Sequence, residues 1–569
     1  MMTFRVPQAS LIFLVASVLA VAFCEESNST SSDYQEEKGT KIEKVFTEVN
    51  ESAYDFDEDY VLPKNIRPLS YKLTFDLHEN KTIGKGSAKI LAKVLEPSSY
   101  IQIHMNHQYV NLTAVSVEYK QRRVYVVPKV TNMMEQQAIN LSLDDELKLS
   151  ELINIRLYFT FLIQDRNATE GFESLKRWQM GARRVFPCFD EPALKSTFTL
   201  EQLIINHTKI NELTPLFNTA VTGRYAVDKS TNIYRFTNPT PKMSVYLVAL
   251  VIGFFPRHAS AVTQRGTRVS VYQHDATRSD AEFSAKIIDQ LEKIYDIRTP
   301  VKKFDIASVQ IAYKAMENWG LITIVDTNLR NTTIHELVHQ WFGNLVTCKT
   351  WDDLFVNEAL TEFYESKMVL ANYQDVNPGE SPPPDFWKQN ETMQKDNAEK
   401  GDYKAIRGGT KVQYKKGQLI VRMLEATVGD RVFLSGIRRY LKRYLYSSAS
   451  ILDFLAEIQK AVNAFNVGPL VYNTFPNVQD FMRGWIDQRG FPTVMVYYNL
   501  YTYQISQYLT GDNTDQWFVP IFIRCPDDTK SNLVGILMPD KNMTIVSRCS
   551  LNVDTLDPDG YAYAQFQFC

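Results

Sequence analysis

The sequence predicts a multidomain α+β protein, with a β-rich N-terminal domain, then a mainly helical domain, then a small C-terminal β-sandwich. Over residues 61–274, long runs alternate between apolar and polar side chains, as half-buried antiparallel strands do. Over residues 275–489 the apolar side chains recur at helical spacing, and strand-like alternation returns over residues 490–569. The 569 residues are enough for several domains and a large buried core.

The first 60 residues are expected to lie outside the folded domains. Arg5 precedes an apolar run that ends near Phe23, so residues 1–24 are interpreted as a signal peptide or an uncleaved anchor. Residues 25–60 are acidic, rich in serine and poor in large aliphatic side chains, which is typical of a disordered stalk. Together with Asn-x-Ser/Thr sequons such as those at Asn111 and Asn140, these segments predict a glycoprotein of the secretory pathway, extracellular or at the cell surface. Membrane association is expected only through the N-terminal segment.

Charge and composition exclude several functions. The net charge is −3, which leaves no basic footprint for nucleic acid and no polybasic membrane patch. The chain has 6 cysteines, too few for a disulfide scaffold. Cys525 and Cys549 are close enough in sequence to join neighbouring strands, although spacing alone does not settle the pairing. Composition does not predict the oligomeric state.

Strands are predicted wherever the apolar side chains have a period of two. Residues 71–77 and 153–163 alternate in this way, and residues 246–255 are apolar enough for a fully buried strand. Near the C-terminus the same reasoning predicts strands at residues 494–498, 517–523 and 533–537. Pro520 places the second of these at the edge of a sheet, because proline cannot donate to a strand ladder.

Helices are predicted where apolar side chains recur every three or four residues. Phe283 to Ile294 follow this spacing after Ser279 and Asp280, which suit a helix start. Residues 335–345 are predicted to form one helix. Further helical segments are predicted around residues 419–424 and 432–444, and the prolines of residues 378–384 mark an exposed loop.

The most informative motif is His335-Glu336-Leu337-Val338-His339. Histidines four residues apart lie on one face of a helix, so both rings can reach one metal ion. Glu358 follows the second histidine at a spacing that lets a neighbouring helix supply a third ligand. Two histidines, one glutamate and an open fourth position are typical of a catalytic zinc site. The alternative for an isolated motif of this kind is an amphipathic helix with a polar face.

The chemistry that this arrangement supports is hydrolysis of an amide bond. Zinc lowers the pKa of a bound water towards ~7. Glu336 is placed to take the proton of that water and to pass it to the leaving amine. The oxyanion that develops needs a second donor besides the metal.

Four motifs in this order resemble those of the aminopeptidase N family of zinc metallopeptidases. They are, from the N-terminus, residues 182–192 (ARRVFPCFDEP), residues 315–320 (AMENWG), residues 335–365 (from HELVH to the glutamate of NEALTEFYE) and residues 414–417 (YKKG). The resemblance runs from about Leu62 to the C-terminus. It implies a thermolysin-like catalytic domain at residues 275–489 that holds one Zn²⁺ per chain and removes the N-terminal residue from peptides with a free N-terminus.

The resemblance also implies roles for single residues. His335, His339 and Glu358 match the zinc ligands, and Glu336 matches the general base. Tyr414 matches the donor to the oxyanion. The side chain that binds the α-ammonium of the substrate is matched by Glu317, and its neighbours in the substrate-binding motif are Ala315, Met316 and Asn318. Asn357, Glu362 and Glu365 are candidates to orient the ligands.

The chain also departs from the family. Lys314 stands where the family motif has glycine, residues 321–334 are shorter than usual, and the chain ends near Phe566 without the family's large C-terminal helical domain. The alternative to an enzyme is therefore a catalytically impaired, aminopeptidase-like protein that binds peptides or other partners. An endopeptidase with the same zinc site is disfavoured by Glu317.

Overall fold

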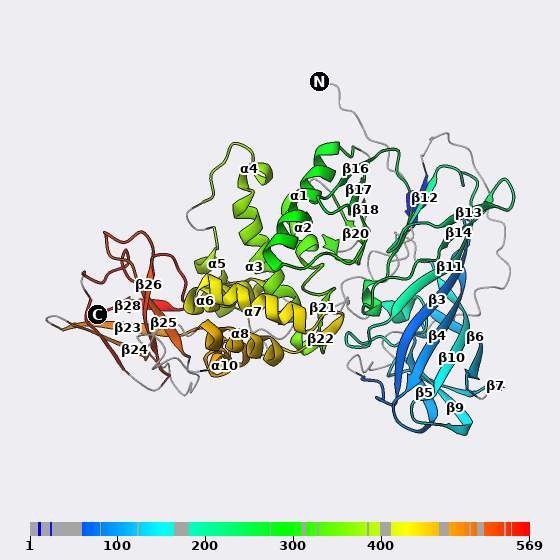
Figure 1. Ribbon diagram of the computed structural model, residues 1–569, viewed down its shortest axis with the longest axis horizontal. Helices are drawn as coiled ribbons and strands as arrows, with labels where there is room; N and C mark the ends of the chain where they lie inside the picture. Colours follow the sequence, from blue (N-terminus) through cyan, green and yellow to red (C-terminus); the bar gives the residue numbers. More distant parts are fainter. Residues whose placement is uncertain are drawn as a thin grey trace. The chain divides into compact units, whose positions relative to one another are not determined.

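A computed structural model describes most of the chain from residue 60 onward (Figure 1). Besides two short strands near the N-terminus, the described residues are 60–79, 81–121, 124–163, 181–273, 275–309, 314–326, 329–383, 386–398, 411–465, 477–499, 502–508, 517–539, 542–547 and 549–569. The predicted signal segment and stalk lie almost wholly outside them. There, only β1 (Ser10–Ile12) and β2 (Phe23–Glu25) are described, and they pair as antiparallel strands.

The chain divides into two compact units. The first consists of Met1–Asp289 and Thr299–Glu336, and the second of Gln290–Arg298 and Leu337–Cys569. One boundary between them falls inside the helix α2 (Arg330–Val338), directly after Glu336.

An eight-stranded sheet dominates the first unit. Its strands, in spatial order, are β13 (Gly223–Ala226), β14 (Thr231–Phe236), β11 (Thr197–Asn206), β3 (Ile66–His78), β4 (Ile83–Val94), β10 (Leu152–Leu162), β6 (Val110–Tyr119) and β7 (Val124–Val126). All neighbours are antiparallel except β3 and β11. The predicted strands at residues 71–77 and 153–163 are confirmed as β3 and β10. Their alternating apolar side chains, such as Phe75 and Phe159, are buried because one face of the sheet meets the core.

Two smaller sheets complete this β-rich part. One holds β5 (Ser98–His104), β9 (Ala138–Leu147) and β8 (Lys129–Met133), and the other pairs β12 (Leu213–Phe217) with β15 (Leu250–Phe254). The predicted strand at residues 246–255 is wrong in its first half. The short 3-10 helix Val245–Leu247 precedes β15, because Leu247 and Val248 donate to carbonyls three residues back and so begin no ladder.

A five-stranded sheet in the first unit contains the first residues of the 315–320 motif. Its strands, in spatial order, are β16 (His258–Val262), β17 (Arg268–Tyr272), β18 (Lys303–Ser308), β20 (Leu321–Ile324) and β19 (Ala315–Met316). The helix α1 (Arg278–Tyr295) connects the parallel strands β17 and β18, as predicted from its apolar spacing. Phe283 of α1 and Thr333 of α2 line one small cavity together with Val271 and Ile306 of the sheet, so both helices cover the same face.

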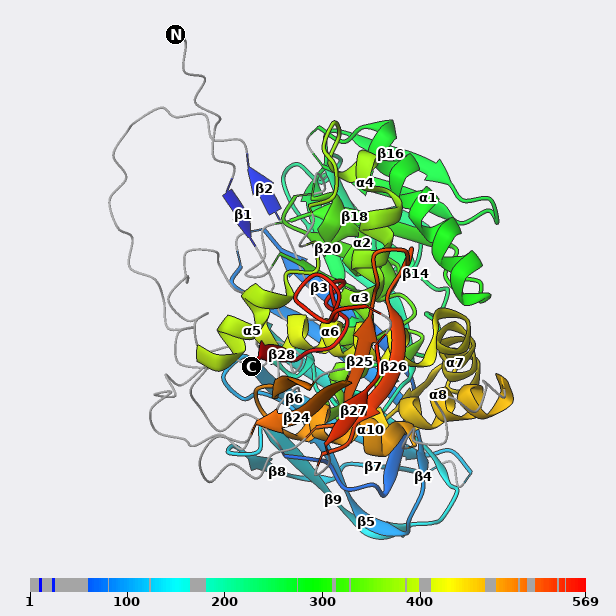
Figure 2. The ribbon, with the colours of Figure 1, turned by 90° about the vertical axis from the view of Figure 1, so that its left-hand side faces the viewer.

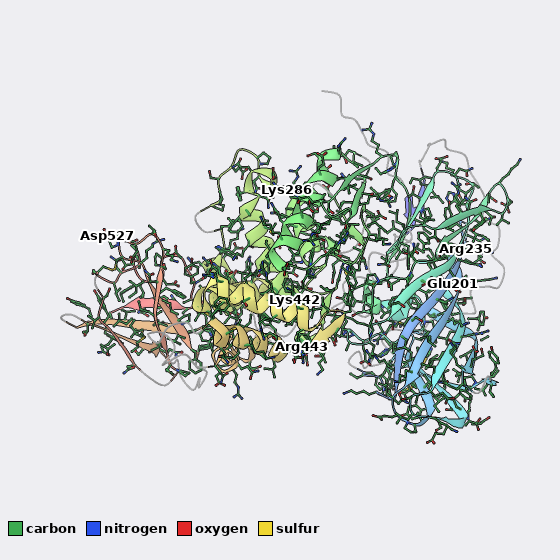
Figure 3. The ribbon with its side chains drawn as sticks, viewed as in Figure 1. Glu201, Arg235, Lys286, Lys442, Arg443 and Asp527 are labelled. Atoms are coloured by element: carbon green, nitrogen blue, oxygen red, sulfur yellow. A yellow bond between two sulfur atoms is a disulfide. The ribbon has the colours of Figure 1, made fainter. Side chains whose placement is uncertain are left out.

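The second unit is mainly helical in its first part. Its helices are α3 (Phe355–Ala371), α4 (Tyr373–Val376), α5 (Gln389–Ala398), α6 (Lys411–Val428), α7 (Asp430–Arg443), α8 (Ile451–Phe465) and α10 (Val478–Asp487). A small parallel pair joins β21 (Val346–Cys348) to β22 (Ser447–Ala449). Lys442 and Arg443 lie in the last turn of α7, where cations complement the negative end of a helix (Figure 3).

The C-terminal part of the second unit is built from strands (Figure 2). A four-stranded sheet holds β27 (Met543–Ile545), β24 (Thr502–Tyr508), β23 (Thr493–Asn499) and β28 (Gln565–Phe568), and a separate pair joins β25 (Val519–Ile523) to β26 (Asn532–Leu537). Pro520 lies in β25, an edge strand of this two-stranded pair, as its residue type predicts. The other side of β25 makes an isolated bridge between Ile523 and Leu556. Cys525 and Cys549 form a disulfide.

Candidate metal centre

The motif from His335 to His339 spans the C-terminal end of α2. His335 and Glu336 belong to the helix, but His339 follows its last residue, Val338. The predicted helix over residues 335–345 is therefore wrong beyond Val338. The chain turns instead, since Trp341 N donates to Val338 O (3.1 Å) and Gly343 N donates to Val346 O (2.8 Å). Gly343 makes this turn possible with a φ of +117°, which side chains other than hydrogen rarely allow.

The ring of His339 is held in one orientation. Its Nδ1 lies 2.9 Å from the carbonyl oxygen of Phe342 and 3.1 Å from Oγ1 of Thr361. A bond from Nδ1–H to the carbonyl makes Nδ1 the donor and leaves the lone pair of Nε2 free to bind a metal. Nε2 faces Glu358, whose Oε2 is 3.4 Å away. Both side chains are buried, so their polar atoms are turned towards each other and away from bulk water.

These residues fit a zinc ion. One donor atom from each of His335, His339 and Glu358 lies within 4.8 Å of the other two. Ligands about 2.0–2.1 Å from zinc at tetrahedral angles lie roughly 3.4 Å apart, which is the separation of His339 Nε2 and Glu358 Oε2. The donor set of two imidazoles and a carboxylate is one of those that catalytic zinc sites use.

The candidate base and the candidate ammonium-binding acid lie beside the second histidine. Carboxylate oxygens of Glu317 and Glu336 and a ring nitrogen of His339 are within 4.8 Å of one another, and all three side chains are buried. Glu317 follows β19, which lies at the end of the five-stranded sheet and carries Ala315 and Met316. Met316 is buried and Ala315 is half-buried.

A tight turn after Glu317 holds this segment in place. Leu321 N donates to Asn318 O (3.0 Å), and Asn318 Oδ1 also accepts from Thr323 Oγ1 (3.4 Å). Gly320 has a φ of +81°, and a Cβ there would stand 2.5 Å from the carbonyl oxygen of Asn218. The Asn218 side chain in turn donates to the carbonyl of Trp319 (2.8 Å). Only glycine therefore fits the turn.

Lys314 does not join this group of acids. Its side chain is exposed, and among the described residues its ammonium has no ion-pair partner, so it does not pair with Glu317. Its backbone carbonyl accepts from Val325 N at 2.9 Å, which extends the pairing of β19 with β20 by one residue.

Tyr414 lies in the first turn of α6, one turn before Gly417. α6 packs closely on α3 at that glycine, because a Cβ on Gly417 would stand 2.7 Å from the Cβ of Ala359, the residue after Glu358. Positions three apart share a helix face, so the face of α6 that meets α3 also carries Tyr414. The Tyr414 side chain is half-buried.

The three other acidic or amide side chains near the motif have different surroundings. Asn357 Oδ1 accepts from Cys348 N (2.9 Å) and so ties α3 to the strand β21. Carboxylate oxygens of Glu362 and Glu365 lie within 4.8 Å of each other and of a ring nitrogen of His335. These two glutamates thus flank the first histidine rather than facing solvent alone.

Some residues that shape the centre were not predicted from the sequence. Thr361 lies three residues after Glu358 on α3, and that spacing was the one available signal for its contact with His339. The contacts of Asn218 with Trp319 and of the Phe342 carbonyl with His339 had no recognisable sequence pattern, since they form only in the folded chain.

Comparison with known proteins places this arrangement in a class of peptidases. Residues 280–485 match the peptidase family M1 domain, and residues 67–247 match the peptidase M1 N-terminal domain. These segments hold the metal ligands and the β-rich part respectively. The chain therefore belongs to the M1 family of peptidases.

Three relatives are similar over most of the chain, each at 27% identity. The puromycin-sensitive aminopeptidase of Caenorhabditis elegans aligns over 83% of this chain and 53% of its own length. The values are 77% and 48% for the glutamyl aminopeptidase of Bos taurus, and 85% and 53% for the protein of Saccharomyces cerevisiae named aminopeptidase 2, mitochondrial. The chain spans about half the length of the curated relatives it matches.

The predicted extracellular or cell-surface location is wrong. The matched relatives include the puromycin-sensitive aminopeptidase and two fungal proteins named aminopeptidase 2, one of which is named as mitochondrial. A short apolar run at the N-terminus was too general a signal to establish a location. Among the described residues, no helix has the length and apolar character needed to span a membrane.

Proposed function

We propose that this chain is a zinc-dependent aminopeptidase that removes the N-terminal residue from peptides with a free N-terminus. The observation that supports it most is the convergence on His339 of two groups of side chains. His335 and Glu358 complete a metal-binding set with it, while Glu317 and Glu336 bring two carboxylates to the same ring. Family membership and relatives named as aminopeptidases agree with this function.

Each residue then has a distinct task. His335, His339 and Glu358 hold the zinc ion, which supplies, when bound, an acidified water and a Lewis acid for the carbonyl oxygen. Glu336 accepts the proton of the attacking water and delivers it to the leaving amine. The hydroxyl of Tyr414 donates a hydrogen bond to the developing oxyanion.

Exopeptidase specificity is assigned to Glu317. Its carboxylate is buried, and a buried carboxylate is best satisfied by a cation that also donates hydrogen bonds. The α-ammonium of a peptide is such a cation. Ala315, Met316 and Asn318 form the adjoining backbone against which the first residues of the substrate lie. We infer the thermolysin-like catalytic domain at residues 275–489 and a β-sandwich at residues 490–569 as the frame of this site.

Zinc content and peptidase activity test the proposal together. Wild-type protein should carry one zinc ion per chain and release the N-terminal residue from aminoacyl reporter peptides. Glu336→Gln should keep the zinc and lose about 10²–10⁴-fold in activity, because the proton-transfer group is gone. Glu282→Gln, on the exposed surface of α1, is the matched control and should leave both unchanged. Activity that survives Glu336→Gln would contradict the assignment.

A second candidate function is a catalytically impaired protein that binds peptides. The observation that favours it is Lys314, whose exposed cation directly precedes β19, the strand that leads to Glu317, and can repel an α-ammonium. Zinc and peptide binding without turnover, restored to turnover by Lys314→Gly, would establish this function in place of the first.

A further inference from the structure

His335 has a charged neighbourhood of its own, apart from the metal ligands. Carboxylate oxygens of Glu362 and Glu365 lie within 4.8 Å of one of its ring nitrogens and of each other. Both glutamates come from α3, the helix that also supplies Glu358. Carboxylates this close repel each other, so the arrangement needs a cation nearby to hold it.

Lys415 of α6 supplies that cation. Its Nζ lies 2.5 Å from Oε2 of Glu362, and the Glu362 side chain is only 12% exposed. Burial lowers the pKa of Lys415, but Glu362 and Glu365 raise it further, and the net change is upward. Lys415 therefore stays charged at neutral pH. It also follows Tyr414 directly in the first turn of α6.

The same geometry argues against a second metal ion at His335, Glu362 and Glu365. The Lys415 ammonium already contacts the Glu362 carboxylate, and a divalent ion there would have to displace it. A histidine bound to a metal through one ring nitrogen commonly gives the other to a carboxylate that orients the ring. Glu362 and Glu365, within 4.8 Å of a ring nitrogen of His335, are the candidates for that task.

We propose that Lys415 is a positioning residue, which acts through Glu362 to hold the ring of His335 for the metal. The proposal rests on the proposed function, in which His335 is a metal ligand. Zinc retention then depends on the ion pair between Glu362 of α3 and Lys415 of α6, although neither side chain is itself a metal ligand. Lys415 follows Tyr414 in the same turn of α6, so the ion pair between Lys415 and Glu362 also holds the backbone that carries the candidate oxyanion donor.

The chain contains a matched control for this ion pair. Lys367 of α3 and Glu425 of α6 form a second pair between the same two helices, with Nζ and Oε1 also 2.5 Å apart. The exposed fractions are comparable, 39% and 13% against 47% and 12%. Neither Lys367 nor Glu425 belongs to a group of metal-ligand type with His335, among the residues the structure describes. Loss of either ion pair weakens the packing of α3 on α6. Of the two, the pair between Lys415 and Glu362 is the one with a carboxylate near His335.

The test measures the rate at which zinc-loaded protein releases zinc to a coloured chelator. Lys415→Met and Glu362→Gln should each release zinc about ten-fold faster than wild type, as is typical when a partner of a metal-bound histidine is lost. Lys415→Arg, which keeps the cation, should release zinc within about two-fold of wild type. The double variant Lys415→Met with Glu362→Gln should release zinc no faster than Glu362→Gln alone, because both substitutions remove the same interaction.

Lys367→Met decides between positioning and packing. It should leave the zinc release rate within about two-fold of wild type. Equal acceleration in Lys367→Met and Lys415→Met would overturn the proposal, and so would wild-type kinetics in Lys415→Met. Circular dichroism of each variant, with and without zinc, separates loss of fold from loss of metal. A wild type that holds zinc but cleaves no peptide contradicts the proposed function while the zinc-release comparison still decides this inference.

Discussion

The contact between Gly417 and Ala359 gives the most quantitative prediction. A Cβ on residue 417 would stand 2.7 Å from the Cβ of Ala359, whereas carbon atoms in contact are about 3.5–4.0 Å apart. In Gly417→Ala, α6 must therefore move from α3 by about an ångström. Overpacking of this kind costs about 1–3 kcal/mol. It exceeds the gain of about 1 kcal/mol that alanine brings to a helix interior, so we expect net destabilisation of up to about 2 kcal/mol.

Gly417→Ala should also lower kcat, and by more than its loss of folding free energy alone would cause. Tyr414 precedes Gly417 by one turn and Glu358 precedes Ala359 directly, so a shift between the helices changes the distance between the candidate oxyanion donor and a candidate metal ligand. A misplacement of about an ångström can cost roughly 10²-fold in rate. The assays are urea unfolding and kcat for an aminoacyl reporter peptide.

The reciprocal substitution is the control. In the double variant Gly417→Ala with Ala359→Gly, one methyl replaces the other across the same contact. The free energies of unfolding of the two single variants should therefore not add, with a coupling of about 1 kcal/mol or more that favours the double variant. If Gly417→Ala instead stabilises the protein by about 1 kcal/mol with unchanged kcat, the helices are not in close contact there and the reasoning is wrong.

Three further predictions concern the turn, the C-terminal part and its disulfide. Gly320→Ala should destabilise by about 1–3 kcal/mol and lower activity, because its φ of +81° and the Asn218 carbonyl both exclude a Cβ; unchanged unfolding and activity would contradict this. Burial raises the pKa of Asp557 to about 7, so the folded state binds its proton more tightly than the unfolded state does. Stability should therefore fall by up to about 4 kcal/mol as the pH rises from about 4 to about 7, and Asp557→Asn should flatten that fall in urea unfolding at pH 5 and pH 8. Reduction of the Cys525–Cys549 bridge, which closes a loop with a sequence separation of 24, should cost about 3 kcal/mol in the same assay, and an equal unfolding midpoint with and without reductant would refute this.

Regular elements were predictable where one face of an element is buried. The alternation at residues 71–77 and 153–163 led to β3 and β10, since period two is visible in any strand with one face in the core. The stretch at residues 246–255 was harder, because side chains buried on all sides have no period and cannot tell a strand from a 3-10 turn.

The candidate ligands were predictable from spacing, but their support was not. The apolar pattern around His339 continues through Phe342 and hides the end of α2 at Val338, which depends on backbone bonds around Gly343. The pair between Glu362 and Lys415 joins residues separated by 53 positions. No local pattern reports a contact of that kind, and only the packing of α3 on α6 creates it.

Diffraction from crystals of zinc-loaded protein at the zinc absorption edge tests the central claim most directly. The account predicts one anomalous peak within bonding distance of nitrogen atoms of His335 and His339 and of a carboxylate oxygen of Glu358. A peak among His335, Glu362 and Glu365 instead, or no peak at either place, would contradict it.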